Sequence, residues 1–315
     1  IRLRQPTGME AIYALEAEPY ALKAAAMELE DALPVGRLFD MDVIGLDGMK
    51  LPRPQPRTCL VCGGPAAPCA RSRAHGLEAV QAATASLLEA FAADALGTAA
   101  RDALVEEAQL TPKPGLIDLA NNGAHRDMDL ESFRRSAQAL TPYFKQAVQI
   151  GLSHPGSGPA MEALRPAGIA AEAAMLEATG GANTHKGLIY ALGLLLCAMG
   201  QTLAGGGENY INHAGQLANI GLPEALRRAK AAPCSHGERI YAHRGVLGAR
   251  GEAAAGFPHA VQALEALRQY RSGATEHQAR LLALVTSMAQ LTDTNLLHRG
   301  GEAGLHLVQR EARRI

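Results

Sequence analysis

The sequence predicts a mainly α protein, with an all-helical domain that follows a small, truncated α+β segment at the N-terminus. Of the 315 residues, 48% are hydrophobic but only 4% are aromatic, and alanine and leucine dominate, which favours close-packed helices. Beyond residue 77 the apolar residues recur at helical spacing. Residues 1–78 have a different texture, in which a helical stretch is followed by an extended one. We therefore divide the chain into residues 1–78 and 79–315.

Composition argues against two classes of partner. The formal net charge is −1, so we expect no nucleic acid to bind through bulk electrostatics. The longest apolar run, residues 188–199, is too short to span a membrane, and no signal peptide is visible. Five cysteines, an odd number, fit a reducing compartment better than a disulfide framework. We expect a cytoplasmic protein, a fragment at both ends, and composition indicates no oligomeric state.

The N-terminal segment contains a pair of acidic residues with strand spacing. Residues 18–33 predict a helix and residues 36–44 predict a strand. Side chains two apart share a face of a strand, so Asp40 and Asp42 would point the same way. Paired carboxylates on a strand commonly hold Mg²⁺ and a triphosphate in nucleotidyl-transfer sites. Two solvated acids on a surface strand explain the same spacing equally well.

Three of the five cysteines follow in one cluster. Cys59-x-x-Cys62 precedes Cys69 and His75, and three thiols with one imidazole are a ligand set for structural Zn²⁺. The CxxC pair has no matching second pair, so reduced structural cysteines are the favoured alternative. Two arginines beside the third cysteine are candidates for phosphate binding: Arg71 and Arg73.

Two strings in this segment, PVGRLFDMDVI and RTCLVCGGPAAPCARSRAH, resemble the C-terminal part of the phosphoribosyl-dephospho-CoA transferases, the holo-citrate lyase synthases. Such enzymes move a phosphoribosyl-dephospho-CoA group onto a serine of an acyl carrier protein. The resemblance implies the citrate lyase acyl carrier protein as a partner, and a domain that lacks its N-terminal part. The candidate site residues of the segment are Arg37, Asp40, Asp42, Arg71 and Arg73.

After a helical stretch that ends near residue 110, residues 111–129 read TPKPGLIDLANNGAHRDMD and are too broken to form one helix. Two prolines stiffen the chain around Lys113, and NNG predicts a turn. A cation beside several carboxylates suits a polyphosphate with its metal ion. The carboxylates are Asp118, Asp127 and Asp129. The alternative is a polar connection, in which Asp129 only caps the helix that starts at residue 130.

Helices are predicted again over residues 130–148 and 161–179, and residues 179–187, TGGANTHKG, then lead into the most apolar helix of the chain. Residues 188–199 are hydrophobic on all sides, which predicts a central, buried helix. Its start carries Asn183, His185 and Lys186, beside backbone N–H groups that favour anions. An ordinary capped helix start is the alternative.

The remaining chain predicts further helices over residues 235–241, 258–270 and 275–291. Between the first two, residues 248–253 (GARGEA) predict a flexible turn that carries Arg250. After the last, Asp293, Asn295 and Arg299 lie near a helix end, where metal-bound phosphates could be met.

Five motifs in order, TPKPGLID, GAHRDMD, ANTHKG, GARGEA and DTNLLHRGGE, resemble the triphosphoribosyl-dephospho-CoA synthase family from about Leu88 to the end. The resemblance implies an all-helical domain that joins ATP to 3′-dephospho-CoA and releases adenine. It also implies that the product serves citrate lyase or malonate decarboxylase, and the upstream segment favours citrate lyase. A glycine-rich C-terminal stretch of the family is absent, so we expect truncation there.

The family chemistry assigns roles to these residues. We assign the triphosphate to Lys113, Lys186, Arg250, Arg299 and Asn295, and Mg²⁺ or the base role to Asp118, Asp127 and Asp293. We assign protonation of the leaving adenine to His185, oriented by Asn183, and expect the set to line one pocket. Two alternatives stay open, a helical Mg²⁺-dependent nucleotide hydrolase and a non-catalytic nucleotide-binding module.

Overall fold

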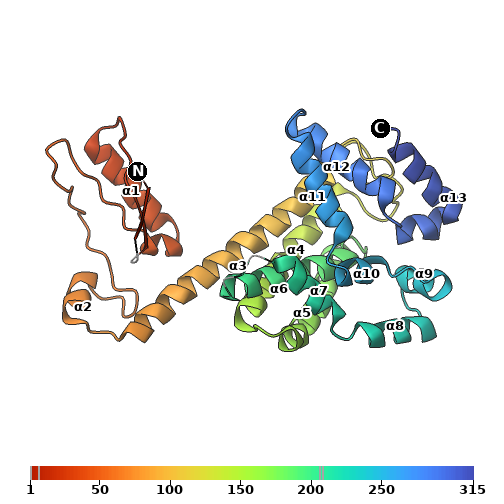
Figure 1. Cartoon of the computed structure of the whole chain (residues 1–315), viewed down its shortest axis with the longest axis horizontal. Coiled ribbons are helices and arrows are strands. Elements are labelled where there is room, and N and C mark those ends of the chain that lie inside the picture. The colour runs from red at the N-terminus through yellow and green to blue at the C-terminus, as the bar shows by residue number, and fades with distance from the viewer. Residues whose placement is uncertain (1, 6–7, 206, 208) are drawn as a thin grey trace. The chain divides into compact units, whose positions relative to one another are not determined.

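The computed structural model describes residues 2–5, 8–205, 207 and 209–315 (Figure 1). The chain forms two compact units, Ile1–Phe91 and Ala92–Ile315. The division falls inside the long helix α3 (Leu77–Gln109). This helix begins close to residue 78, where the sequence pattern changes to regular helical spacing.

The first unit contains a hairpin, one long helix and extended chain. Strands β1 (Arg2–Gln5) and β2 (Gly8–Ala11) pair antiparallel, with Arg2 opposite Ala11. Helix α1 (Pro19–Ala32) starts where the Glu18 carboxylate accepts the N–H of Ala21. The 3₁₀ helix η1 (Pro34–Leu38) comes next, and the short helix α2 (Ala66–Ser72) follows further along the chain. The buried apolar core of the unit consists of Ala26, Val43 and Leu51, among the residues described.

The predicted strand over residues 36–44 is wrong. Gly36 lies in η1, packed so closely on α1 that a Cβ would sit 2.5 Å from the carbonyl oxygen of Glu30. Residues 39–43 form no strand, and among residues 36–44 only Ile44 makes a bridge, to Lys50. A strand needs a partner along its length, and the tight turn at residues 45–48 leaves room for one bridge. The β structure of the unit is instead the hairpin, which sequence analysis did not predict.

All regular secondary structure in the described residues of the second unit is helical, as predicted. After α3 its helices are α4 (Leu130–Ser153), α5 (Ser157–Ala178), α6 (Lys186–Gly205), α7 (Tyr210–Asn219), α8 (Leu222–Ala231), α9 (His236–Arg244), α10 (Gly248–Ala254), α11 (Pro258–Tyr270), α12 (Glu276–Gln290) and α13 (Thr294–Ala312). One predicted turn is wrong, because GARGEA forms α10. Its glycines permit a helix once neighbours pack on it, and Ala253 is buried.

Helix α6 is the central helix, and its position confirms the prediction from its all-round hydrophobicity. Every residue from 188 to 202 is buried or half-buried, although α4 contributes more fully buried residues. Two glycines let α4 and α6 touch backbone to backbone: a Cβ on Gly151 would lie 1.9 Å from the carbonyl oxygen of Cys197, and one on Gly200 would lie 2.3 Å from that of Val148. By length and composition α6 passes the test for a membrane-spanning helix, which core helices of soluble proteins also pass.

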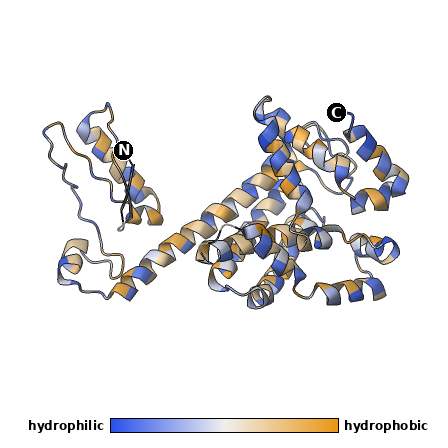
Figure 2. Cartoon of the chain, viewed as in Figure 1, coloured by the Kyte–Doolittle hydropathy of each residue, from blue (hydrophilic) through white to orange (hydrophobic). Residues whose placement is uncertain are grey.

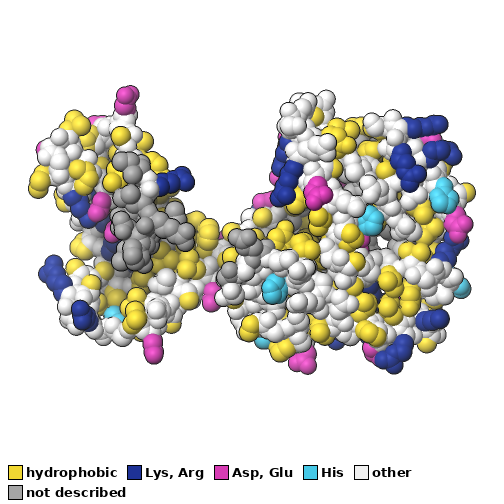
Figure 3. Space-filling model, in the orientation of Figure 1, with side chains coloured by type: hydrophobic (Ala, Val, Ile, Leu, Met, Phe, Trp, Pro, Cys, Tyr) yellow, Lys and Arg dark blue, Asp and Glu magenta, His cyan; other side chains and the backbone are white. Residues whose placement is uncertain are grey.

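The surface of the second unit is polar where its last helix ends. The final turns of α13 are hydrophilic in Figure 2, and basic side chains gather over this helix on the face shown in Figure 3. Arg310, Arg313 and Arg314 are exposed there. The end of α13 is therefore solvated, and the core of the unit lies around α4, α5 and α6.

Candidate active site

Asp118 holds the shape of the segment 111–129. One carboxylate oxygen accepts the hydroxyl of Thr111 (2.8 Å) and the N–H of Lys113 (2.9 Å), and the other accepts the N–H groups of Ala120 (2.8 Å) and Asn121 (2.9 Å). These bonds, led by that from Lys113, lower the pKa of Asp118 to about 2. The buried carboxylate is therefore ionised, and bonds within the loop occupy its acceptor sites.

Lys113 also points inward. Its ammonium donates to the carbonyl oxygen (2.6 Å) and carboxylate (2.7 Å) of Glu107 in the last turns of α3, and only 4% of the residue is exposed. A cation at this position balances the negative end of the helix dipole. In the described conformation Lys113 therefore fastens the loop to α3 and does not face solvent.

The first two sequence motifs lie against each other. Ile117 and Met128 of the segment 111–129 form a buried cluster with Ala182, which precedes α6, and Phe133 of α4 packs on this cluster. Within the segment Gly123 is required, because its φ is +56° and a Cβ would meet the backbone of Leu116 at 2.5 Å. The tertiary structure thus brings TPKPGLID and GAHRDMD to the ANTHKG segment.

His185 is buried between α4 and the start of α6. Its Nδ1 lies 2.7 Å from the hydroxyl of Ser136, which also accepts the Thr184 hydroxyl (2.8 Å). The ring packs edge-on against Phe133, with centroids 4.8 Å apart. Burial lowers the pKa of His185 to about 4, so the ring is neutral at pH 7.

The other two candidates at the start of α6 have local partners. The side-chain oxygen of Asn183 accepts the N–H of Lys186 at 3.2 Å, which caps the helix. The Lys186 ammonium pairs with Glu172 of α5, and half of its side chain is exposed. Sequence analysis missed Ser136 and Thr184, because a serine within an apolar helical stripe carries no signal of a histidine partner.

The start of α13 approaches the GAHRD motif. Burial and then the charge of Arg299 lower the pKa of His125, while Asp127 raises it, so the three groups are neighbours. Asp293 caps α13 by accepting the N–H groups of Asn295 (2.6 Å) and Leu296 (3.1 Å). Asp127 and Arg299 are both exposed. The charges of a cation and a carboxylate from distant segments therefore both act on His125.

Arg250 lies on α10 and forms a 3.0 Å ion pair with Glu238 of α9. Burial raises the pKa of Tyr190 on α6, and the charges of Arg250 and Arg165 partly oppose this rise. This interaction places the charge of Arg250 near the first turns of α6. The prediction that the whole set lines one pocket is not tested by these contacts and stays a prediction.

The first unit has a pocket of about 510 Å³ that Asp40 and Asp42 line together. Asp42 pairs with Lys50 at 2.6 Å, and Asp40 lies 3.7 Å from Arg57. The buried carboxylate of Glu30 pairs with Arg57 and with Arg53, and both arginines also line the pocket. Sequence analysis missed the lining residues Lys23, Glu30, Lys50, Arg53 and Arg57.

The other predicted residues of this unit, Arg37, Arg71 and Arg73, do not line this pocket. Arg37 donates to the hydroxyl of Thr58 at 2.7 Å and to its carbonyl oxygen, so it holds the chain just before Cys59. Arg71 lies on α2 and Arg73 caps it, and both are exposed. Thus the two arginines are free to meet a phosphate in solution.

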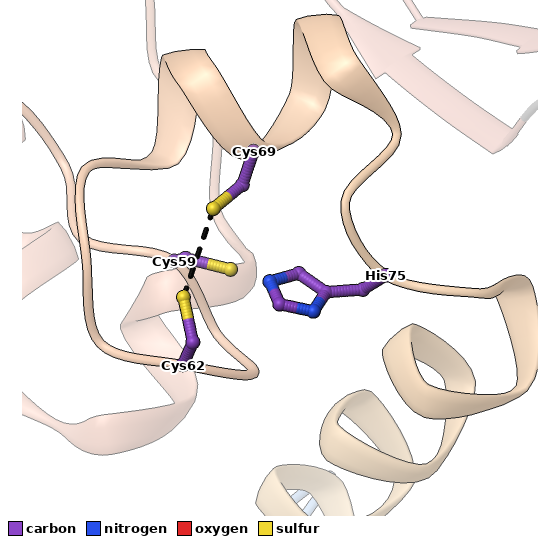
Figure 4. A group of neighbouring side chains, drawn as sticks. All are labelled: Cys59, Cys62, Cys69 and His75. Atoms are coloured by element: carbon purple, nitrogen blue, oxygen red, sulfur yellow. Dashed lines mark hydrogen bonds between the residues drawn. The ribbon is translucent and has the colours of Figure 1, made fainter.

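The cysteine cluster is compact (Figure 4). The ligand atoms of Cys59, Cys62, Cys69 and His75 all lie within 4.8 Å of one another. The backbone N–H groups of Cys62 and Val61 lower the pKa of the Cys59 thiol to about 6. The spacing of these residues in the sequence did not determine whether the four side chains converge.

Comparison with known proteins defines the class of the chain as a two-part transferase. Residues 93–315 match the family model for ATP:dephospho-CoA triphosphoribosyl transferase, and residues 1–91 match that for apo-citrate lyase phosphoribosyl-dephospho-CoA transferase. The chain belongs to the ATP:dephospho-CoA triphosphoribosyl transferase family, with a segment of the second family before it. It is thus an enzyme of citrate lyase prosthetic group synthesis.

Relatives have the same organisation or match the helical part. Protein CitXG of Haemophilus influenzae is 37% identical over 323 residues, which cover 97% of this chain and 69% of that protein. The probable 2-(5''-triphosphoribosyl)-3'-dephosphocoenzyme-A synthase of Vibrio cholerae M66-2 is 43% identical, over 70% of this chain and 73% of that protein. The synthase of Pectobacterium atrosepticum is 45% identical, over 68% and 73%. No solved structure matches the chain.

Proposed function

We propose that the helical unit joins ATP to 3′-dephospho-CoA, forming 2′-(5″-triphosphoribosyl)-3′-dephospho-CoA and adenine, at the surface where the segment 111–129 meets the starts of α6 and α13. The observation that carries this site is the packing of Ile117 and Met128 on Ala182, because it joins the two motifs of the segment 111–129 to the distant ANTHKG motif. The proximity of Arg299 to His125 adds the fourth.

The reaction exchanges one bond at the ribose C1 of ATP for another. The 2′-oxygen of dephospho-CoA forms a bond to C1, the C1–N9 bond to adenine breaks, the hydroxyl proton passes to a base, and adenine takes up a proton. Positive charge develops on the ribose, as in glycoside hydrolysis, so a carboxylate near C1 stabilises the transition state. The triphosphate stays on the ribose, so cations must hold it without promoting its cleavage.

Asp127 is our candidate base, because it is exposed and acts, like Arg299, on the neighbouring His125. His185 stays our candidate partner of the leaving adenine, and we assign it the neutral tautomer in which Nδ1 accepts from Ser136 and Nε2–H donates to the base. A neutral donor stabilises charge on the departing base. Asn183 supports this role by capping the helix that carries the neighbouring Lys186.

The triphosphate is assigned to Lys186, Arg299, Arg250 and Asn295. Lys186 and Arg299 are exposed and reach solvent from the starts of two helices. Asp118 and Lys113, in contrast, are assigned to positioning, because both are buried and bonded within or behind the loop. Lys113 enters the phosphate site only if it exchanges Glu107 for a substrate phosphate.

Magnesium fits two of the three predicted carboxylates. Mg²⁺ is usually held by one or two carboxylates together with substrate phosphates. Asp127 is exposed, and Asp293 uses a single oxygen, Oδ1, for both of its capping bonds. Asp118 does not fit, since four donors occupy its oxygens. When bound, Mg²⁺ would neutralise charge on the triphosphate.

The first unit is proposed to act in the next step, the attachment of the prosthetic group to the citrate lyase acyl carrier protein. Its pocket combines Asp40 and Asp42 with cations from Lys50, Arg53 and Arg57, a combination that suits a metal-bound phosphate. Both steps use ATP-derived or CoA-derived metabolites, and we accordingly propose a cytoplasmic location.

The test is incubation of the chain with ATP, Mg²⁺ and 3′-dephospho-CoA, followed by chromatography for adenine and mass spectrometry of the CoA product. Adenine and the triphosphoribosyl product should appear in equal amounts, and only when both substrates are present. Release of ADP or inorganic phosphate without adenine would instead identify a nucleotide hydrolase. Binding of ATP without any product would identify a non-catalytic module.

A further inference from the structure

We propose that Cys59, Cys62, Cys69 and His75 form a structural Zn²⁺ site that holds together the second half of the first unit. The four side chains lie on a loop, on α2 and just beyond it, and converge in Figure 4. The site is separate from the 510 Å³ pocket, since none of the four residues lines that pocket.

The distances suit one tetrahedral ion. With Zn–S bonds of about 2.3 Å, tetrahedral geometry separates two sulfur ligands by about 3.8 Å. The sulfur atoms of Cys62 and Cys69 are 3.6 Å apart, and all four ligand atoms lie within 4.8 Å of one another. Small side-chain rotations are therefore sufficient to bring all four onto a single Zn²⁺.

The backbone shapes the loop that presents the first two thiols. Gly63, next to Cys62, has a φ of +72°, and its N–H donates to the carbonyl oxygen of Cys59 at 3.0 Å. The N–H of Cys59 donates to Gly64, and Thr58 bridges to Pro65. This turn directs both cysteines of the CxxC pair to one side, before any ion binds.

The other two ligands come from α2 and the turn that ends it. Cys69 lies on α2, and Arg73 ends this helix in the left-handed region, with φ of 50°. The N–H of Ala74 then donates to the carbonyl oxygen of Cys69 at 3.0 Å, and the turn brings the His75 ring towards the thiols (Figure 4). The tight turn at the end of α2 therefore brings the His75 imidazole next to the three thiols.

An unpartnered nitrogen at the cluster points to a missing ligand. Nε2 of His75 is buried and has no hydrogen-bond partner among the described residues. Buried polar atoms are nearly always bonded, because an unmade bond costs free energy. A metal ion among the three sulfur atoms would satisfy this nitrogen.

The surrounding chain has little else to hold it. Each of residues 52–91, all described by the structure, is exposed or half-buried, and the buried core of the unit involves only α1 and residues 43–51. Small segments without a core are commonly stabilised by a disulfide or a metal ion. Three thiolates and an imidazole select Zn²⁺ over the harder Mg²⁺, and four protein ligands leave no position for catalysis.

The first experiment measures metal in the untagged full chain, purified under reducing conditions without chelator. We expect elemental mass spectrometry to find one zinc ion per chain, and the Cys69→Ser variant to lose nearly all of its zinc. Cys234→Ser, at an exposed cysteine outside the cluster, is the matched control and should keep its zinc. Zinc-free wild-type protein, or equal zinc loss in both variants, would overturn the proposal.

A second measurement does not depend on how well a variant folds. Cobalt(II) replacing zinc in the wild-type chain should give the visible bands of a tetrahedral site and near-ultraviolet thiolate charge-transfer bands. Removing the ion with a chelator should speed proteolytic cleavage within residues 52–76 and leave the helical unit intact. An octahedral cobalt spectrum, or a disulfide between Cys62 and Cys69 in peptide mapping, would also contradict the zinc site.

Discussion

Acidification should destabilise the helical unit through His185. Its pKa is about 4 in the folded chain, below the ordinary 6.5, because the ring is buried. The unfolded chain therefore binds a proton more readily, and the stabilisation is complete above pH 6.5 and is lost as pH falls from 6.5 to 4. From these two values, the free energy of unfolding should fall by about 2 kcal/mol between pH 7 and pH 5.

The assay is thermal and urea unfolding between pH 7 and pH 5, followed by circular dichroism. For a domain of this size, a loss of about 2 kcal/mol lowers Tm by roughly 4–8 °C. His185→Gln should be less stable at pH 7 but should lose most of this pH dependence, because the titrating group is gone. His277→Gln, at an exposed histidine, is the control and should keep the wild-type slope.

The reasoning fails if His185→Gln and His277→Gln have the same dependence on pH. That result would mean that His185 titrates as an ordinary, hydrated histidine, and that neither its burial nor its bond to Ser136 controls its protonation. The assignment of a neutral ring to the leaving adenine would then lose its basis as well.

Three further predictions follow from the same contacts. Lys186→Ala should weaken ATP binding by about 1.5–3 kcal/mol with little change in kcat, because the triphosphate is bound in both ground and transition states. Titration calorimetry measures the binding and steady-state kinetics measures kcat, and a lowered kcat with unchanged binding would contradict this assignment. Asp118→Asn should speed proteolysis within residues 111–129, since an amide nitrogen cannot accept the N–H bonds that one carboxylate oxygen accepts; an unchanged cleavage rate would refute its positioning role. Gly151→Ala should destabilise the chain by about 1–3 kcal/mol or more through overpacking, because its Cβ would lie 1.9 Å from a carbonyl oxygen of α6. Gly158→Ala, where a Cβ meets nothing within 4 Å, is the control, and equal melting temperatures for the two variants would disprove the close crossing.

Local sequence determined the elements whose signal is strong over a short range. Prolines and glycines keep residues 111–129 out of any helix, and the unbroken apolar run of α6 makes burial the only stable outcome in water. The five motifs in order were likewise sufficient for the family, which the matches over residues 93–315 confirm. The strand over residues 36–44 failed, because pairing depends on a neighbouring strand that local pattern cannot supply.

Only the tertiary structure decided which candidate side chains are free. From residue type alone, Lys113 was predicted to bind phosphate and Asp118 to bind the metal. In the folded chain Lys113 instead pairs with Glu107, and the Asp118 carboxylate accepts backbone N–H groups. Ser136, from a helix nearly fifty residues earlier in the chain, orients His185. Contacts between residues so far apart arise from the way the helices pack. Sequence spacing specifies which groups a segment carries, and folding selects the ones that meet.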